Sequence, residues 1–183
     1  MKLAIFDMDG TLYNTNDVNY FAYKEGLNTF GVDLDYEYYC NYCNGRHYKV
    51  FIPPLVDNDE EKIEEIHKIK KNAYSKYLDK VKVNERLFDI IRLIKNEYKI
   101  VLVTTASKKN TEEILKYTKK IELFDDIITA DDISKPKPDP EGFNLAIQRF
   151  NVDPKNAIIF EDAEVGIEAA RKTGAVIFKV EKF

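Results

Sequence analysis

The sequence predicts an α/β fold built on a doubly wound parallel sheet, into which a small helical domain is inserted. Apolar runs at 3–6, 100–103 and 157–160 are typical of strands that are buried on both faces. Segments with apolar residues at helical spacing alternate with these runs, and this alternation favours a parallel sheet. Residues 13–78 contain no convincing buried strand and are rich in aromatic side chains, which indicates a separate helical insertion.

The insertion contains one strong helix signal. Over 59–78, apolar residues recur at helical spacing among Glu and Lys, which predicts an amphipathic helix. We therefore expect the core domain to comprise residues 1–13 plus 81–183, and the inserted helical domain to comprise residues 14–80.

The rest of the core alternates between helices and strands. Asn84 and Asp139, the second followed by Pro140, have the side chains of helix N-caps, and Gly174 is a helix stop. The expected elements are helices starting at 84 and 139, helices over 111–117 and 165–172, and strands over 127–129 and 175–178. In such sheets, ligands bind beyond the carboxyl ends of the strands, so polar residues there are candidates for a site.

The first apolar run ends in two acids, Asp7 and Asp9. Their side chains point the same way if the segment is extended. Carboxylates at the end of a buried strand are costly to desolvate unless something binds them, and Mg²⁺ prefers oxygen ligands. The sequence therefore predicts a divalent cation here.

Other strand ends carry compatible groups. Thr104 and Thr105 follow the second run, where a hydroxyl and the N–H groups of a helix start can hold a phosphate. Glu161 and Asp162 follow the run at 157–160. A loop with two lysines, Ser-Lys-Pro-Lys-Pro-Asp-Pro, occupies 134–140 just before a helix.

Taken in order, these segments resemble the four motifs of the haloacid dehalogenase-like phosphohydrolases. The first is Asp-Met-Asp-Gly-Thr-Leu at 7–12, and the fourth is Glu-Asp followed by Gly166. The insertion lies where this family has a helical cap on a Rossmann-like core, and the overall pattern is closest to its beta-phosphoglucomutase and phosphoglycolate phosphatase-like branch. The resemblance implies an enzyme with Asp7 as nucleophile, Asp9 as general acid–base and Lys135 as the lysine of the third motif.

The resemblance also implies the ligands. Mg²⁺ would be held by Asp7, Asp162, the backbone carbonyl of Asp9 and Glu161, and the phosphoryl oxygens by Lys135 and Thr104, with Thr105 in a similar role. The function implied is hydrolysis of a small phosphorylated metabolite, such as a sugar phosphate, through an aspartyl phosphate.

Alternatives remain. A sugar phosphomutase would share every core residue, and a phospho-aspartate signalling receiver also joins acids, a hydroxyl and a lysine on such a sheet. The second acid and the inserted domain argue against a receiver, and a non-catalytic phosphate-binding protein is the least favoured. Arg46, after Gly45, is either a substrate contact or an ordinary surface arginine. The mutase pattern has a histidine at the place of Asn19 or its neighbour, and this sequence has none there, which favours hydrolysis.

Composition excludes several classes of partner. The net charge of −4 argues against a nucleic-acid partner, and no apolar run reaches the roughly 18 residues that a membrane span needs. Cys40 and Cys43 with His47 are too few for a four-ligand zinc site, so we interpret them as buried helix cysteines. We expect a cytoplasmic protein that is a monomer or a weak dimer.

Overall fold

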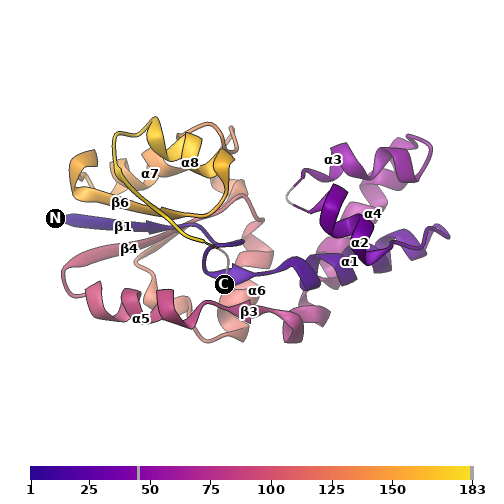
Figure 1. Ribbon diagram of the computed structural model, residues 1–183, viewed down its shortest axis with the longest axis horizontal. Coiled ribbons are helices and arrows are strands. Elements are labelled where there is room, and N and C mark those ends of the chain that lie inside the picture. Colours follow the sequence, from indigo (N-terminus) through magenta and orange to yellow (C-terminus); the bar gives the residue numbers. More distant parts are fainter. Residues whose placement is uncertain (45, 182–183) are drawn as a thin grey trace. The chain divides into compact units, whose positions relative to one another are not determined.

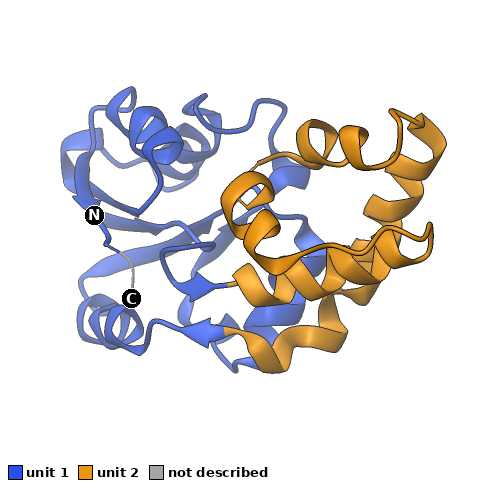
Figure 2. Ribbon diagram, turned by 45° about the vertical axis from the view of Figure 1, so that its right-hand side comes forward, with its two compact units in different colours: residues 1–14, 82–183 blue, residues 15–81 orange. Residues whose placement is uncertain are grey.

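The computed structural model describes residues 1–44 and 46–181. The chain divides into two compact units, a core unit of residues 1–14 plus 82–183 and an inserted unit of residues 15–81 (Figure 2). Each boundary lies one residue later than we expected. No helix in the described ranges is both long enough and apolar enough to span a membrane.

The core unit contains a five-stranded parallel sheet in the order β5-β4-β1-β6-β7. The strands are β1 (Lys2–Phe6), β4 (Tyr98–Val103), β5 (Asp126–Ile128), β6 (Ala157–Glu161) and β7 (Val176–Lys179). The central strand is β1, whose residues 3–6 are fully buried. Phe6 at its end is aligned with Leu102 on β4 and Phe160 on β6, so the carboxyl ends of three strands meet at one edge.

Helices cover both faces of this sheet. They are α5 (Glu85–Ile94), α6 (Lys108–Tyr117), α7 (Glu141–Arg149) and α8 (Glu164–Arg171), with 3-10 turns at Ile121–Leu123, Ala130–Asp132 and Pro154–Asn156. Figure 1 shows α7 and α8 on one side of the sheet and α5 and α6 on the other. On the α7 side, Leu3 and Ile5 of β1 belong to the same buried cluster as Phe143 and Ala169. The prediction of a doubly wound α/β fold is confirmed.

Local capping explains where the core helices begin. Asn84 caps α5, as expected, by accepting a hydrogen bond from the Leu87 N–H. Helix α6 begins earlier than the expected 111, because the Ser107 hydroxyl accepts from the Asn110 N–H and caps an additional turn. The cap of α7 also differs from our expectation: the helix begins at Glu141 after Pro140, and Asp139 accepts from the Glu141 N–H.

The inserted unit is helical. Its elements are α1 (Asn16–Asn28), α2 (Tyr36–Tyr38), a π-helix (Tyr39–Cys43), α3 (Tyr48–Phe51), a 3-10 turn (Pro53–Leu55), α4 (Glu60–Ala73) and a 3-10 segment (Tyr74–Lys80). The expected helix over 59–78 is therefore α4 plus its 3-10 continuation. Helices α1 and α4 pack closely, since a Cβ at Gly26 would lie 2.9 Å from the Ile66 carbonyl oxygen. Several aromatic residues of this unit are buried in its core, among them Tyr20, Tyr23 and Phe51.

The chain leaves the core unit and returns to it through a small second sheet. Strands β2 (Tyr13–Asn14) and β3 (Lys82–Val83) are antiparallel, and Asn14 is aligned with Lys82. We did not expect these strands, because two residues are too few to form a recognisable pattern.

Candidate active site

Three acidic side chains gather at the carboxyl edge of the sheet. Asp7 follows β1, Glu161 ends β6 and Asp162 follows it. One carboxylate oxygen from each lies within 4.8 Å of the others. Asp7 and Glu161 are buried and Asp162 is half-buried, so three acids share a site with little solvent to separate their charges.

Asp9 lies two residues beyond Asp7, in the turn after β1. It is half-buried, and it forms a β-bridge with Tyr13. Among the residues that the structure describes, it is not one of the group whose carboxylates converge. Its expected role in metal binding was through the backbone carbonyl, and that remains a prediction.

The lysine at these acids is Lys137. Its Nζ atom lies 2.5 Å from Asp7 Oδ1 and 2.7 Å from Glu161 Oε2, and 11% of its side chain is exposed. Lys135 is exposed, and its backbone N–H donates to Glu141. The prediction that Lys135 is the lysine of the site was therefore wrong, and Lys137 replaces it.

Hydrogen bonds in the loop before α7 explain why Lys137, and not Lys135, lies at the acids. The Glu141 carboxylate, in the first turn of α7, accepts from the N–H and hydroxyl of Ser134 and from the N–H of Lys135. These bonds hold that part of the loop at the exposed start of the helix. Two residues later, the Lys137 ammonium lies 4.9 Å from the centre of the Phe143 ring. The Lys-Pro pair occurs twice, so the signal that distinguishes the two lysines is their spacing from this aromatic residue of the helix.

Charge and burial shift the pKa values in this cluster. Burial, and then the charge of Asp7, raise the pKa of Glu161 to about 7, although Lys137 acts in the opposite direction. Burial and Asp7 also raise the pKa of Asp162. Burial by itself would lower the pKa of Lys137, but the charges of Asp7 and Glu161 outweigh it and the pKa is raised. The ammonium is therefore charged at neutral pH.

Backbone N–H groups and closely packed glycines surround the two acids at the end of β6. Glu161 Oε1 accepts from the N–H groups of Asp162 and Ala163, each at 3.1 Å. A Cβ at Gly166 would lie 2.1 Å from the Glu161 carboxylate, so a larger residue there would require this carboxylate to move from its present position. Gly10 has a φ of +95°, and a Cβ on it would lie 2.2 Å from Asp162 Oδ2.

The Thr11 hydroxyl donates to Asp162 Oδ1 at 2.9 Å. Sequence reasoning did not identify this contact, because Thr11 read as part of the first motif without a role of its own.

The donor set fits a hard divalent cation. Three acids and one lysine leave an excess of negative charge, and every candidate ligand atom is an oxygen, as Mg²⁺ prefers. Within residues 1–44 and 46–181, this is the one group of three or more Cys, His, Asp or Glu side chains close enough to hold a metal.

Cys43 is buried, but Cys40 is exposed, so the expectation of two buried cysteines was wrong for Cys40.

Comparison with known proteins identifies the family of the chain. A family model described as haloacid dehalogenase-like hydrolase matches residues 4–180. The chain belongs to this family. The resemblance seen in the motifs is thereby confirmed, and so is the expectation of a phosphatase enzyme.

Among related sequences, validoxylamine A 7'-phosphate phosphatase of Streptomyces hygroscopicus subsp. limoneus is 31% identical to this hydrolase, over 94% of this chain and 82% of the relative. Pyrophosphatase PpaX of Bacillus cereus is also 31% identical, over 96% of this chain and 83% of the relative. Among solved structures, CbbY of Rhodobacter sphaeroides in complex with phosphate is 26% identical, with a TM-score of 0.84 over 100% of this chain and 88% of that one. A putative beta-phosphoglucomutase of Thermotoga maritima is 26% identical, with a TM-score of 0.77 over 100% of this chain and 87% of that one.

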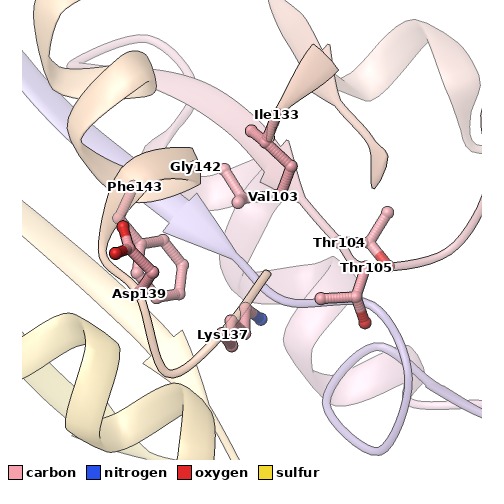
Figure 3. A pocket seen from close by; sticks show the side chains of 8 residues that line it. All are labelled: Val103, Thr104, Thr105, Ile133, Lys137, Asp139, Gly142 and Phe143. Carbon is pink, nitrogen blue, oxygen red and sulfur yellow. The ribbon is translucent and has the colours of Figure 1, made fainter. Parts of the chain in front are cut away.

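A small pocket of the hydrolase lies between the carboxyl end of β4 and Lys137. Thr104, Thr105, Lys137 and Phe143 are among its lining residues (Figure 3). Thr104 is buried, and its hydroxyl accepts from the Ala106 N–H at 3.0 Å, while Thr105 is exposed. The structure thus brings the expected threonines beside a lysine, and that lysine is Lys137.

The predicted substrate residues belong to the inserted unit of the hydrolase. Arg46 is exposed, and its N–H donates to the Cys43 carbonyl at 3.1 Å. Asn19 lies on α1, where its side-chain amide donates to the Thr15 hydroxyl at 3.2 Å. Gly45 lies outside the described residues.

Proposed function

We propose that this hydrolase cleaves small phosphorylated metabolites through an aspartyl phosphate formed on Asp7, with Mg²⁺ as its cofactor. The observation that carries the proposal is the surroundings of Asp7. This carboxylate is buried at the end of the central strand, beside a charged lysine and two further acids. A buried carboxylate that is paired with a lysine at the carboxyl edge of the sheet is suited to attack a phosphorus atom.

In the first step, an Asp7 oxygen attacks phosphorus in line, and the bond from phosphorus to the substrate oxygen breaks. Asp9 gives its proton to the departing alkoxide. In the second step, the Asp9 carboxylate takes a proton from water, and the water oxygen attacks the same phosphorus. The phosphate leaves, and Asp7 is regenerated. General acid–base assistance of this kind contributes about 10²–10⁴-fold to the rate.

The phosphoryl oxygens carry the charge that develops during transfer, and positioning them is the main task in this chemistry. Lys137 neutralises both the nucleophile and the incoming group, and Thr104 and the backbone N–H groups that follow it bind the phosphoryl oxygens. Asp7 and Asp162 would hold Mg²⁺, with Glu161 in support and the Asp9 carbonyl as a further ligand. When bound there, the cation shields the negative charges of nucleophile and phosphate from one another.

The substrate class is a small metabolite with a phosphate ester, and a phosphorylated sugar is the first choice. Two relatives support this class by name, the validoxylamine phosphate phosphatase and a phosphorylated carbohydrates phosphatase of Thermotoga maritima that is 28% identical. Pyrophosphate is a second substrate to test, because another relative is named for it.

A sugar phosphomutase is the alternative, since related structures carry that name. A mutase must protect its phospho-aspartate from water until the bisphosphorylated intermediate has turned over. Asn19 donates to Thr15 and does not change charge near neutral pH, unlike a histidine in that position. Water should therefore discharge the intermediate, and net hydrolysis is the expected reaction.

The test is a panel of sugar phosphates, other phosphate monoesters and pyrophosphate, with Mg²⁺, in which release of phosphate is measured. A hexose 1-phosphate with its bisphosphate activator is included, and both products are followed. The Asp7→Asn variant is the control, because its amide is nearly isosteric and is a poor nucleophile. We expect phosphate release by the wild type and none by the variant. Isomerisation that is faster than phosphate release would establish a mutase, and turnover by Asp7→Asn would overturn the aspartyl-phosphate mechanism.

A further inference from the structure

A line of hydrogen bonds runs from the start of α5 to Asp162. The Asn84 side-chain amide donates to the Thr11 carbonyl oxygen at 3.1 Å, and the Thr11 hydroxyl donates to Asp162 Oδ1 at 2.9 Å. We infer that Thr11 and Asn84 are positioning residues that orient the Asp162 carboxylate and thereby set the affinity of the site for its divalent cation. This inference rests on the metal site of the proposed function.

The geometry around Asp162 restricts how its carboxylate can turn. Thr11 is fully buried, and its hydroxyl holds Oδ1. On the other oxygen, the backbone of Gly10 approaches so closely that a Cβ would lie 2.2 Å from Oδ2. A ligand held in this way needs no reorientation when a cation binds. Groups that orient a metal ligand are commonly worth 10–100-fold in affinity.

Asn84 fixes the loop on which Thr11 lies. Its backbone N–H donates to the Leu12 carbonyl at 2.9 Å, so the residue holds two successive carbonyls of the loop. Its side-chain oxygen meanwhile accepts from the Leu87 N–H and caps α5. Ser or Asp could supply the cap, but Asn84 makes the two bonds with separate atoms, its amide oxygen for the cap and its amide nitrogen for Thr11, whereas a Ser hydroxyl has a single oxygen and an Asp carboxylate has no donor. Because the buried Asn84 side chain uses both its amide oxygen and its amide nitrogen, we infer a role beyond capping the helix.

The first experiment measures cation affinity without turnover. Metal-free protein is titrated with Mn²⁺, without substrate, and free Mn²⁺ is followed by electron paramagnetic resonance. Thr11→Val keeps the shape of the side chain and removes the hydroxyl, and we expect it to weaken Mn²⁺ binding by about ten-fold or more. Thr11→Ser restores the hydroxyl and should recover most of the affinity. Thr111→Val is the matched control, because Thr111 is equally buried but its hydroxyl bonds to the Ser107 carbonyl.

The second experiment asks whether Asn84 acts through Thr11. Asn84→Ser retains a capping oxygen and loses the amide donor, and we expect it to weaken Mn²⁺ binding by a few-fold, on the scale of one hydrogen bond. In a Thr11→Val background, the same substitution should have little further effect, because coupled residues are not additive.

The outcomes separate the two proposals. Absence of Mn²⁺ binding by the wild type would refute the metal site itself. Binding by the wild type that Thr11→Val leaves unchanged would refute the positioning role alone. Equal losses of Mn²⁺ affinity in Thr11→Val and Thr111→Val would show that destabilisation of the core causes the effect, and would refute the positioning role. Additive losses of Mn²⁺ affinity for the Thr11 and Asn84 substitutions would refute the claim that Asn84 acts through Thr11.

Discussion

The two lysines of the loop before α7 provide an internal test of the site. Lys137→Ala removes the ammonium that contacts Asp7 and Glu161, whereas Lys135→Ala changes an exposed side chain on the same loop. Both substitutions remove the same charge from the chain. A difference between them therefore reports on position and not on net charge.

The expected size of the effect follows from burial. Removing one partner of a buried ion pair costs about 3–5 kcal/mol, because the remaining charge is left uncompensated. Substitution at an exposed position usually changes stability by less than about 0.5 kcal/mol. In the reaction, loss of a group that stabilises developing charge costs about 10²–10³-fold in kcat. We expect Lys137→Ala to show both effects and Lys135→Ala to show neither.

The measurements are kcat and KM with p-nitrophenyl phosphate, together with urea unfolding of the metal-free proteins at pH 5 and pH 8. The stability deficit of Lys137→Ala should be larger at pH 8, because at pH 5 Glu161 can take up a proton and relieve the unpaired charge. A Lys135→Ala variant that loses 10²-fold in kcat while Lys137→Ala retains it would refute the assignment of Lys137. Equal stability of Lys137→Ala and the wild type at pH 8 would refute the argument from burial.

Four further predictions concern the acids and one glycine. Asp9→Asn should lose about 10²–10⁴-fold in kcat, and normal turnover would place the proton relay elsewhere. Chelation should abolish phosphate release and Mg²⁺ restore it, with Asp162→Ala inactive at ordinary Mg²⁺; full activity of that variant would contradict its role as a ligand. Because burial and Asp7 raise the pKa of Glu161 from 4.5 to about 7, its contribution to the stability of the metal-free protein is present below pH 4.5 and is lost as pH rises to about 7. Glu161→Gln should therefore give a flatter unfolding free energy over that interval, measured in urea, and an unchanged slope would be the contrary result. Gly10→Ala should weaken Mn²⁺ binding, since its Cβ would collide with Asp162; unchanged affinity would show that the loop relaxes.

Much of the fold could be predicted because the central strands are buried on both faces. The runs at 3–6, 100–103 and 157–160 are continuous and apolar, and each became a strand of the main sheet. Strands β2 and β3 have two residues each, so no periodicity could reveal them.

The site was predictable where side chains follow strands directly. Asp7, Thr104 and Asp162 each follow a strand, and the register of the parallel sheet aligns the ends of these strands at one edge. Their gathering at that edge could therefore be predicted from the sequence. The lysine comes from a loop, and its side chain is placed by contacts that depend on three-dimensional structure, with Glu141 holding one end of the loop and Phe143 lying beside the ammonium. The sequence contains two adjacent Lys-Pro pairs, and only their spacing from Phe143 distinguishes them, a signal whose meaning the folded loop makes clear.

The pairing of β2 with β3 has a consequence for engineering. Because Asn14 and Lys82 are aligned across an antiparallel pair, the two points at which the inserted unit joins the core are next to one another. A short hairpin turn is enough to bridge such a pair, so excision of residues 15–81 leaves no gap that the core must close by distortion. For the same reason, a helical unit from another protein, with its ends equally close, can be grafted there without changing the register of the main sheet. The core unit is thus a scaffold in which whole inserted units can be exchanged at one pair of adjacent strands.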